Sequence, residues 1–206
     1  IDEHHHTEKD VTPEDRKQYL DLLELIKKLK KATDDMRFFD KSQPYVTKTR
    51  YIQEILDSKD VYFLYQIKNP FVLCYKPFKY PHWYYGLKDK YERMTKSCEQ
   101  VSNTYKYFLS DSKHLKHYKI VKFEDMALKL KETVEDICNF LELDFDEEHM
   151  IHHPDRNFTS VSTLPYKKNT AHDDGTKDCA DKELDKIIAD KCADIIKKFD
   201  YSIPPR

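Results

Sequence analysis

Glycine is nearly absent from this sequence, which has only Gly86 and Gly175 among its 206 residues. A phosphate-binding loop of the P-loop type needs several glycines, because its backbone amides must come close to the phosphate oxygens. These residues therefore contain no P-loop, and a function that depends on such a loop within this stretch is excluded.

The sequence also lacks a long apolar run and an excess of charge of one sign. No segment approaches the roughly 20 consecutive apolar residues of a membrane-spanning helix. The 36 basic and 38 acidic residues give a net charge of −2, which argues against a dedicated nucleic-acid-binding protein. The sequence begins at Ile1 rather than Met and shows no signal peptide, so we expect a processed or trimmed chain.

Cysteine is present five times, but no two cysteines have the C-x-x-C spacing of common zinc sites. We therefore expect no metal site. Cys138 and Cys192 fall on apolar helical faces, where a free cysteine is typically a small core residue. Three adjacent histidines at positions 4–6 cannot share one face of a helix or strand, so we interpret residues 1–11 as a solvated, flexible tail.

Helical periodicity predicts much of the regular structure. Apolar residues recur at intervals of three and four in four segments: residues 13–31, 91–108, 134–141 and 184–199. Residues 49–56 also look like a short helix. Thr12 followed by Pro13 is a helix-start signal, and Asp181 is the expected cap of the last helix. We expect the apolar stripes of segments 91–108 and 184–199 to form core: Tyr91, Met94, Cys98, Val101, Tyr105 and Phe108, then Leu184, Ile188, Cys192, Ile195 and Phe199.

Two short apolar segments, residues 61–67 (VYFLYQI) and 118–123 (YKIVKF), predict strands that are buried in a parallel sheet. Helix signals follow each of them: Asn69-Pro70 after the first, and Glu124-Asp125 after the second. Strands that alternate with helices favour an α/β fold with a central, mostly parallel sheet flanked by helices. We predict that the two strands are neighbours or near-neighbours in that sheet, within one domain over residues 12–206.

A more specific pattern follows the second predicted strand. Residues 121–126 (VKFEDM) and 132–143 (ETVEDICNFLEL) resemble PAPS-dependent sulfotransferases, in which a basic residue, an aromatic and Glu-Asp-Leu end a core strand. In that family a helix that closes on Phe-Leu-Gly-Leu comes next. The resemblance implies the three-layer, P-loop-like sulfotransferase fold and transfer of a sulfonate from PAPS to a hydroxyl acceptor. Among sulfotransferases, the sequence resembles the carbohydrate or Golgi type rather than the small-phenol type.

The resemblance also implies that part of the domain precedes this sequence. Sulfotransferases hold the 5′ end of PAPS with a strand–loop–helix near their N-terminus, and no such loop occurs here. We therefore expect an N-terminally incomplete domain that a further segment or a partner chain completes. The expected acceptor is a small molecule or a carbohydrate. A glycosylation sequon at Asn157 slightly favours the Golgi lumen or secretory pathway and leaves the cytoplasm open.

Five lysines are the candidate site residues that the resemblance implies. Lys41 lies in FDKSQPY, which resembles a Glu-Lys-Ser-Pro-x-Tyr loop whose lysine lies near the transferring sulfonate. Lys68 stands where an arginine of the family binds the 3′-phosphate of PAPS or PAP, and Lys76 stands where a serine binds the same phosphate. Lys167 and Lys168 belong to a basic loop of the kind that closes over PAP. A solvated loop is the alternative interpretation for Lys41 and for this late loop.

Two alternatives to an active sulfotransferase remain open from the sequence. The missing P-loop glycines, and the lysines in place of the family's arginine and serine, favour a sulfotransferase-fold protein that serves as a non-catalytic binding or structural component. A nucleotide kinase shares the general fold but needs the same glycine loop, so it ranks below both. The sequence identifies no catalytic base.

Overall fold

The structure is a computed structural model that describes residues 5–31, 33, 37–41, 46–56, 61–79, 86–151 and 181–204. The chain divides into two compact units, although its sequence indicates no boundary within residues 12–206. Unit 1 comprises Ile1–Phe63 and Lys106–Tyr118, and unit 2 comprises Leu64–Tyr105 and Lys119–Arg206.

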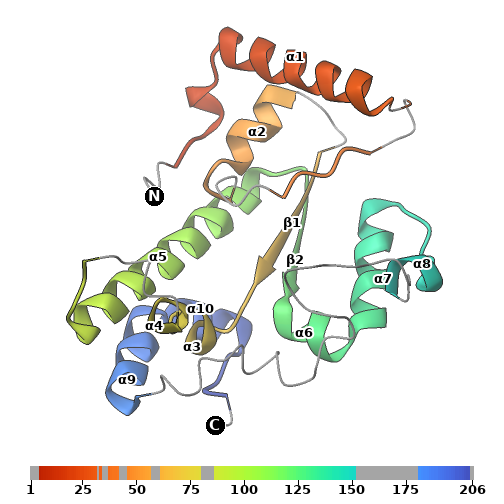
Figure 1. Ribbon diagram of the computed structural model, residues 1–206. Coiled ribbons are helices and arrows are strands. Elements are labelled where there is room, and N and C mark those ends of the chain that lie inside the picture. The colour runs from red at the N-terminus through yellow and green to blue at the C-terminus, as the bar shows by residue number, and fades with distance from the viewer. Residues whose placement is uncertain are drawn as a thin grey trace. The chain divides into compact units, whose positions relative to one another are not determined.

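Two strands, β1 (Tyr62–Ile67) and β2 (His117–Lys122), pair in one parallel sheet that helices flank (Figure 1). Both contribute residues to each unit. The predicted pair of neighbouring parallel strands and the α/β fold class are therefore confirmed. Among the residues that the structure describes, the sheet has these two strands only.

Unit 1 is mainly helical. Its elements are η1 (Glu8–Asp10), α1 (Pro13–Lys30), α2 (Thr49–Leu56) and η4 (Ser112–His114), together with the end of α5 (Lys90–Asp111). The predicted start of α1 is confirmed, because the Thr12 hydroxyl accepts a hydrogen bond from the backbone of Asp15 and the Asp15 carboxylate accepts one from the backbone of Thr12.

Helix α1 has the predicted period but buries none of its side chains. Four of its leucines are exposed, between 41% and 72%: Leu20, Leu22, Leu25 and Leu29. The sequence pattern therefore predicted the helix correctly. The apolar residues of this helix, however, are not buried and form no core in unit 1.

Unit 2 holds the main core. Its helices are α3 (Pro70–Leu73), α4 (Lys76–Lys79), most of α5, α6 (Phe123–Leu128), α7 (Leu130–Leu141), α8 (Glu147–Ile151), α9 (Lys182–Lys191) and α10 (Ala193–Phe199). A core cluster joins the end of β1 with α3, α5, α9 and α10, and it contains Ile67, Phe71, Cys74, Tyr75, Met94, Cys98, Val101, Tyr105, Leu184, Ile188, Cys192 and Ile195. Most residues of the two predicted apolar stripes belong to this cluster, but Tyr91 is 45% exposed, Phe199 is half-buried, and the buried Phe108 belongs to unit 1.

Two of the predicted helices are each divided in the structure. The helix expected over residues 184–199 breaks at Cys192, whose φ of −109° and ψ of 16° end α9 before α10 begins. The helix that follows β2 breaks at Lys129, with φ of −135° and ψ of 52°, between α6 and α7. Periodicity did not reveal either break, because the apolar spacing continues through it.

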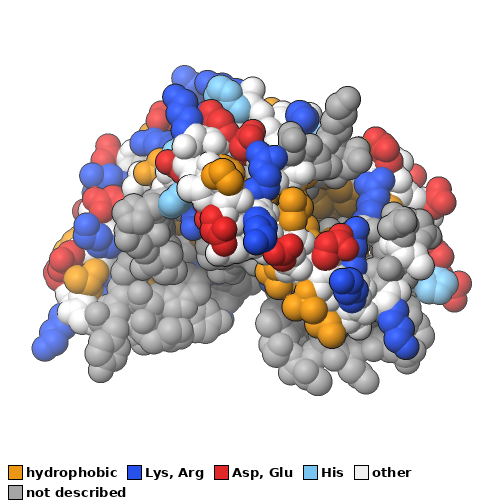
Figure 2. Space-filling model, turned by 90° about the horizontal axis from the view of Figure 1, so that it is seen from above, with side chains coloured by type: hydrophobic (Ala, Val, Ile, Leu, Met, Phe, Trp, Pro, Cys, Tyr) orange, Lys and Arg blue, Asp and Glu red, His pale blue; other side chains and the backbone are white. Residues whose placement is uncertain are grey.

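Charges of both signs are mixed on one face of the molecule. On the face that Figure 2 shows, Lys and Arg side chains alternate with Asp and Glu, and hydrophobic side chains lie between them. Within the described residues, no helix has the length and apolar character needed to cross a membrane.

Candidate functional site

Lys68 follows the carboxyl end of β1, and hydrogen bonds with Tyr105 fix the position of its backbone. The backbone N–H of Lys68 donates to the Tyr105 hydroxyl at 3.0 Å, and that hydroxyl donates to the Lys68 carbonyl at 2.8 Å. Burial raises the pKa of Tyr105 above its ordinary value, which keeps the hydroxyl protonated and able to donate. The Tyr105 side chain of α5 therefore satisfies both backbone polar groups of Lys68, a residue that is only 8% exposed.

The next residue, Asn69, makes hydrogen bonds with three other residues. Its backbone N–H donates to the Glu124 carboxylate at 2.8 Å, and its side-chain amide donates to the Ser202 carbonyl at 2.8 Å. Its side-chain oxygen accepts from the backbone of Phe71 at 3.0 Å and so caps α3, with Pro70 in the first helical turn.

The Lys68 ammonium lies over the aromatic ring of Phe123, 4.3 Å from the ring centroid. Phe123 opens α6 and belongs to the VKFEDM pattern that the sequence singled out. The cation at the end of β1 therefore packs against the residue that follows β2. In open α/β folds the carboxyl ends of parallel strands form the crevice where ligands bind, and Lys68 directly follows the carboxyl end of β1.

A hollow of about 380 Å³ lies beside the same strand ends in unit 2. Its lining includes the last residues of both strands, Ile67 and Lys122, and the polar side chains of Lys129, Thr133 and Asp125. Sequence reasoning missed this hollow, although the family pattern did point to the basic residue at position 122.

The Lys122 side chain lines this hollow and contacts the C-terminal residues Phe199 and Tyr201. Its ammonium donates to the Phe199 carbonyl at 2.6 Å and lies 5.2 Å from the centroid of the Tyr201 ring. The Tyr201 hydroxyl donates to the Glu124 carboxylate at 3.4 Å. Burial and this carboxylate raise the pKa of Tyr201 above its ordinary value. These contacts join the end of β2 to the C-terminal residues.

The predicted site lysines are distributed over different parts of the chain. Lys68 and Lys76 belong to unit 2 and flank α3, where Lys76 is half-buried and begins α4. Lys41 belongs to unit 1 and is exposed. Lys167 and Lys168 lie outside the described residues.

Unit 1 contains a buried polar cluster that the sequence did not indicate. The Asp111 side chain is fully buried and accepts from the Thr49 hydroxyl at 3.0 Å. Its other oxygen lies 2.8 Å from Nε2 of His5 and 3.9 Å from Nη1 of Arg50. The His5 ring also stacks on Tyr107, with centroids 4.6 Å apart.

This cluster gives the N-terminal residues a defined place within unit 1. Residues 8–10 form η1, and a hydrogen bond of 3.1 Å joins the His6 backbone N–H to the Thr47 carbonyl. Residues 5–11 thus differ from the flexible tail expected over residues 1–11. The physical reason is that the carboxylate of Asp111, 106 positions from His5 in the sequence, supplies a buried partner that local sequence cannot reveal.

Comparisons with known proteins agree with this architecture. Two solved structures have similar folds: the sulfotransferase domain from the Synechococcus PCC 7002 olefin synthase and the sulfotransferase domain from the curacin biosynthetic pathway. The first is 17% identical with a TM-score of 0.56, covering 96% of this chain and 73% of that one. The second is 14% identical with a TM-score of 0.57, covering 88% and 68%.

No curated protein matches the sequence. The family model described as "Sulfotransferase domain" matches residues 6–191. This match covers most of the chain, and the two structural likenesses show the same fold. The chain therefore belongs to the sulfotransferase domain family, whose activity is sulfonate transfer.

Proposed function

We propose that this chain takes part in sulfonate transfer from PAPS to a hydroxyl acceptor, and that Lys68 binds the 3′-phosphate of the nucleotide. The observation that supports this proposal is the position of Lys68, a buried cation at the carboxyl end of β1. Two hydrogen bonds with Tyr105 fix its backbone. The proposed acceptor class is a glycan hydroxyl, with a small-molecule hydroxyl as the other member of that chemistry.

The residues of unit 2 fit the 3′-phosphate end of PAPS by charge. Lys68 contributes an ammonium that attracts a phosphate but lacks the two-pronged geometry of an arginine. Lys76 adds a second positive charge at the position where the family has a serine hydroxyl. The 5′ end of PAPS finds no P-loop within this sequence, so only the 3′ end is assigned to residues here.

The transfer itself makes simple demands on a protein. A bond forms between the acceptor oxygen and sulfur while the bond from sulfur to the phosphate oxygen of the donor breaks, and the acceptor proton passes to a base. Positive side chains stabilise the charge that develops on the sulfonate and on the departing phosphate. In this proposal Lys41 serves that role, and Lys167 and Lys168 close over the nucleotide.

A non-catalytic binding protein with the sulfotransferase fold is the second candidate. The specific observation in its favour is that lysines stand at positions 68 and 76, where the family has an arginine and a serine. Such a protein would retain the nucleotide site without turnover.

Calorimetry with PAP and 5′-AMP tests the nucleotide site, because of the two ligands only PAP carries the 3′-phosphate. We expect PAP to bind more tightly, and Lys68→Ala to weaken PAP binding by about 1.5–3 kcal/mol, the range for charge-assisted hydrogen bonds. This loss corresponds to roughly tenfold or more in Kd. Lys88→Ala, which removes an exposed lysine of unit 2, serves as the matched control.

The result also separates the two candidate functions. Equal affinity for PAP and 5′-AMP, or unchanged PAP affinity in Lys68→Ala, contradicts the 3′-phosphate site. If the site is confirmed, transfer of radiolabelled sulfonate from PAPS to a panel of glycan and small-molecule hydroxyls decides the rest. Labelled product supports the enzyme, whereas PAP binding without product over the whole panel supports the binding protein.

A further inference from the structure

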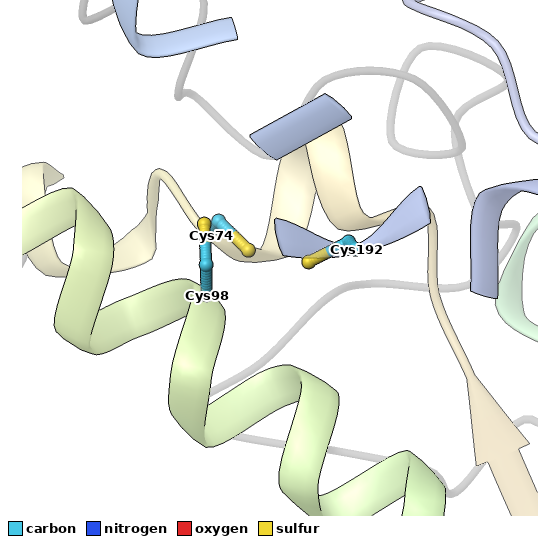
Figure 3. Close-up of side chains that lie close together, drawn as sticks. All are labelled: Cys74, Cys98 and Cys192. Carbon is cyan, nitrogen blue, oxygen red and sulfur yellow. The ribbon is translucent and has the colours of Figure 1, made fainter. Parts of the chain in front are cut away.

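Three cysteines from different parts of unit 2 meet in its core. Cys74 follows α3, Cys98 lies in α5, and Cys192 lies at the break between α9 and α10 (Figure 3). The three sulfur atoms all lie within 4.8 Å of one another. The side chains are 0%, 0% and 1% exposed, so the cluster is closed to solvent.

The fold brings each sulfur to this point by its own local geometry. Helix α3 ends after one turn, and the backbone N–H of Cys74 donates to the Pro70 carbonyl at 2.9 Å. The break at Cys192 starts a new helix, because the Cys192 carbonyl accepts from the backbones of Ile195 and Ile196 at 3.0 and 2.9 Å. The cluster therefore joins four helices, counting α9 and α10 separately.

The arrangement differs from that of an ordinary buried cysteine. A single buried cysteine is a small apolar core residue, and Cys138 in α7 fits that description. Three sulfurs in one place instead form a set of soft ligands, of the kind that select copper(I), zinc and iron–sulfur clusters. Three sulfurs bound to one ion at about 2.3 Å are separated by about 4 Å, which is within the spread seen here.

We propose that Cys74, Cys98 and Cys192 form a binding site for a soft, thiophilic metal ion. Neither Lys68 nor Lys76 is among its ligands. The number of ligands favours copper(I) over zinc, since structural zinc sites almost always have four protein ligands. In the described part of the chain, the group of cysteine, histidine and carboxylate ligands at this point consists of these three residues.

Met94 supplies further soft character near the cluster. It lies one helical turn before Cys98 on α5, is fully buried, and belongs to the same core cluster. Its thioether is a ligand type that suits copper(I) and adds no charge to the core. A set of three cysteines and a buried thioether nearby both distinguish this core from a structural zinc site with four ligands.

Metal binding must displace protons from these thiols. Hydrogen bonding with Cys192, together with burial, raises the pKa of Cys98 to about 12, and hydrogen bonds from the other two thiols raise the pKa of Cys74. The thiols of Cys74 and Cys98 are therefore protonated at neutral pH in the metal-free protein. Each cysteine that binds as a thiolate releases one proton to solvent, and no electron is transferred when copper is supplied as copper(I).

An anaerobic competition titration against a chromogenic copper(I) chelator tests this site. We expect the whole chain to retain one copper(I) per molecule at a chelator concentration that strips surface sites, and to lose at least tenfold in affinity in Cys98→Ser. Cys138→Ser is the matched control, because it changes a buried cysteine of unit 2 outside the cluster. A parallel titration with Zn²⁺ should show weaker binding.

X-ray absorption of the copper-loaded wild-type chain gives a second reading that does not depend on a variant folding. We expect a shell of sulfur atoms, whereas binding by the histidines near the N-terminus would give a nitrogen shell. Retention of no copper(I), a nitrogen shell, or equal affinity in Cys98→Ser overturns the proposal. A disulfide between two of the three cysteines in the anaerobically purified chain, seen by intact mass, also overturns it.

Discussion

Tyr105 shows how a single side chain in this protein fixes the backbone of a candidate ligand residue. Its hydroxyl both accepts from and donates to the backbone of Lys68, and it lies within the core of unit 2. A ring of the same size without the hydroxyl would fill the same space but leave two buried polar groups unpaired.

Tyr105→Phe should therefore destabilise the protein by about 1–3 kcal/mol, the cost of leaving buried donors and acceptors unsatisfied. Urea unfolding measures this loss, and it should be accompanied by weaker PAP binding if Lys68 binds the phosphate. Tyr91→Phe in the same helix is the control, since Tyr91 is 45% exposed and should change stability by less than about 0.5 kcal/mol. Equal stability of the two variants would show that the Lys68 backbone finds other partners.

At the scale of single elements, the shortage of glycine affects how helices end. Glu142 and Asp200 follow α7 and α10 with φ of 55° and 52°, in the left-handed region that glycine adopts most easily. The backbone N–H of Leu143 donates to the Cys138 carbonyl at 2.9 Å, and that of Tyr201 donates to the Ile196 carbonyl at 2.9 Å. Position 142 is where the family pattern Phe-Leu-Gly-Leu, which residues 140–143 resemble, has its glycine.

Glu142→Gly should stabilise the protein by about 0.5–1 kcal/mol, because glycine relieves the left-handed strain. It keeps the two hydrogen bonds that end α7, which the backbone N–H groups of residues 142 and 143 donate to the carbonyls of Asn139 and Cys138. The midpoint of urea unfolding measures the gain. Glu142→Ala is the control that removes the carboxylate and keeps the strained Cβ. A gain of the same size in both variants would assign the effect to charge rather than to backbone conformation.

The last helical stripe offers the sharpest test of the core. Ile188 is fully buried in α9, so Ile188→Asp should cost about 4 kcal/mol or more, because an unpaired carboxylate is expensive in an apolar core. Thermal melting measures this loss. Ala189→Asp places the same charge on the next, exposed residue and should shift the melting temperature little. A similar small shift in both would place the stripe outside the core.

At the scale of the whole molecule, the buried thiols and tyrosines make stability depend on alkaline pH. The pKa of Cys98 is raised from an ordinary value of 9.0 to about 12, and burial also raises the pKa of Tyr65 and Tyr105. A group whose pKa is higher in the folded state holds its proton more tightly there. Its full contribution is present below the unfolded pKa and is lost as pH rises through the folded one.

We therefore expect the metal-free protein to lose stability progressively as pH rises from about 9 toward 12. Urea unfolding at about pH 8 and about pH 10.5 measures the loss. Cys98→Ala should show a shallower decline over the same interval, because one of the shifted thiols is gone. A stability that stays constant up to pH 10.5 would mean that the cluster is open to solvent.

Much of the fold follows from the sequence alone, because it depends on neighbours along the chain. The Thr12–Pro13 start of α1 and the two apolar strands are local signals, and the structure confirms each of them. The VKFEDM pattern likewise identified the family that the residue 6–191 match shows.

Only the tertiary structure decided which distant residues meet. The cysteines of the thiol cluster have no common spacing, and the partners of Lys68, at positions 105 and 123, lie on other elements. The exposure of the α1 leucines is decided in the same way, since periodicity shows that a helix has an apolar face but not what covers it. Side-chain packing between segments far apart in the chain determines these outcomes, and a linear pattern carries no record of it.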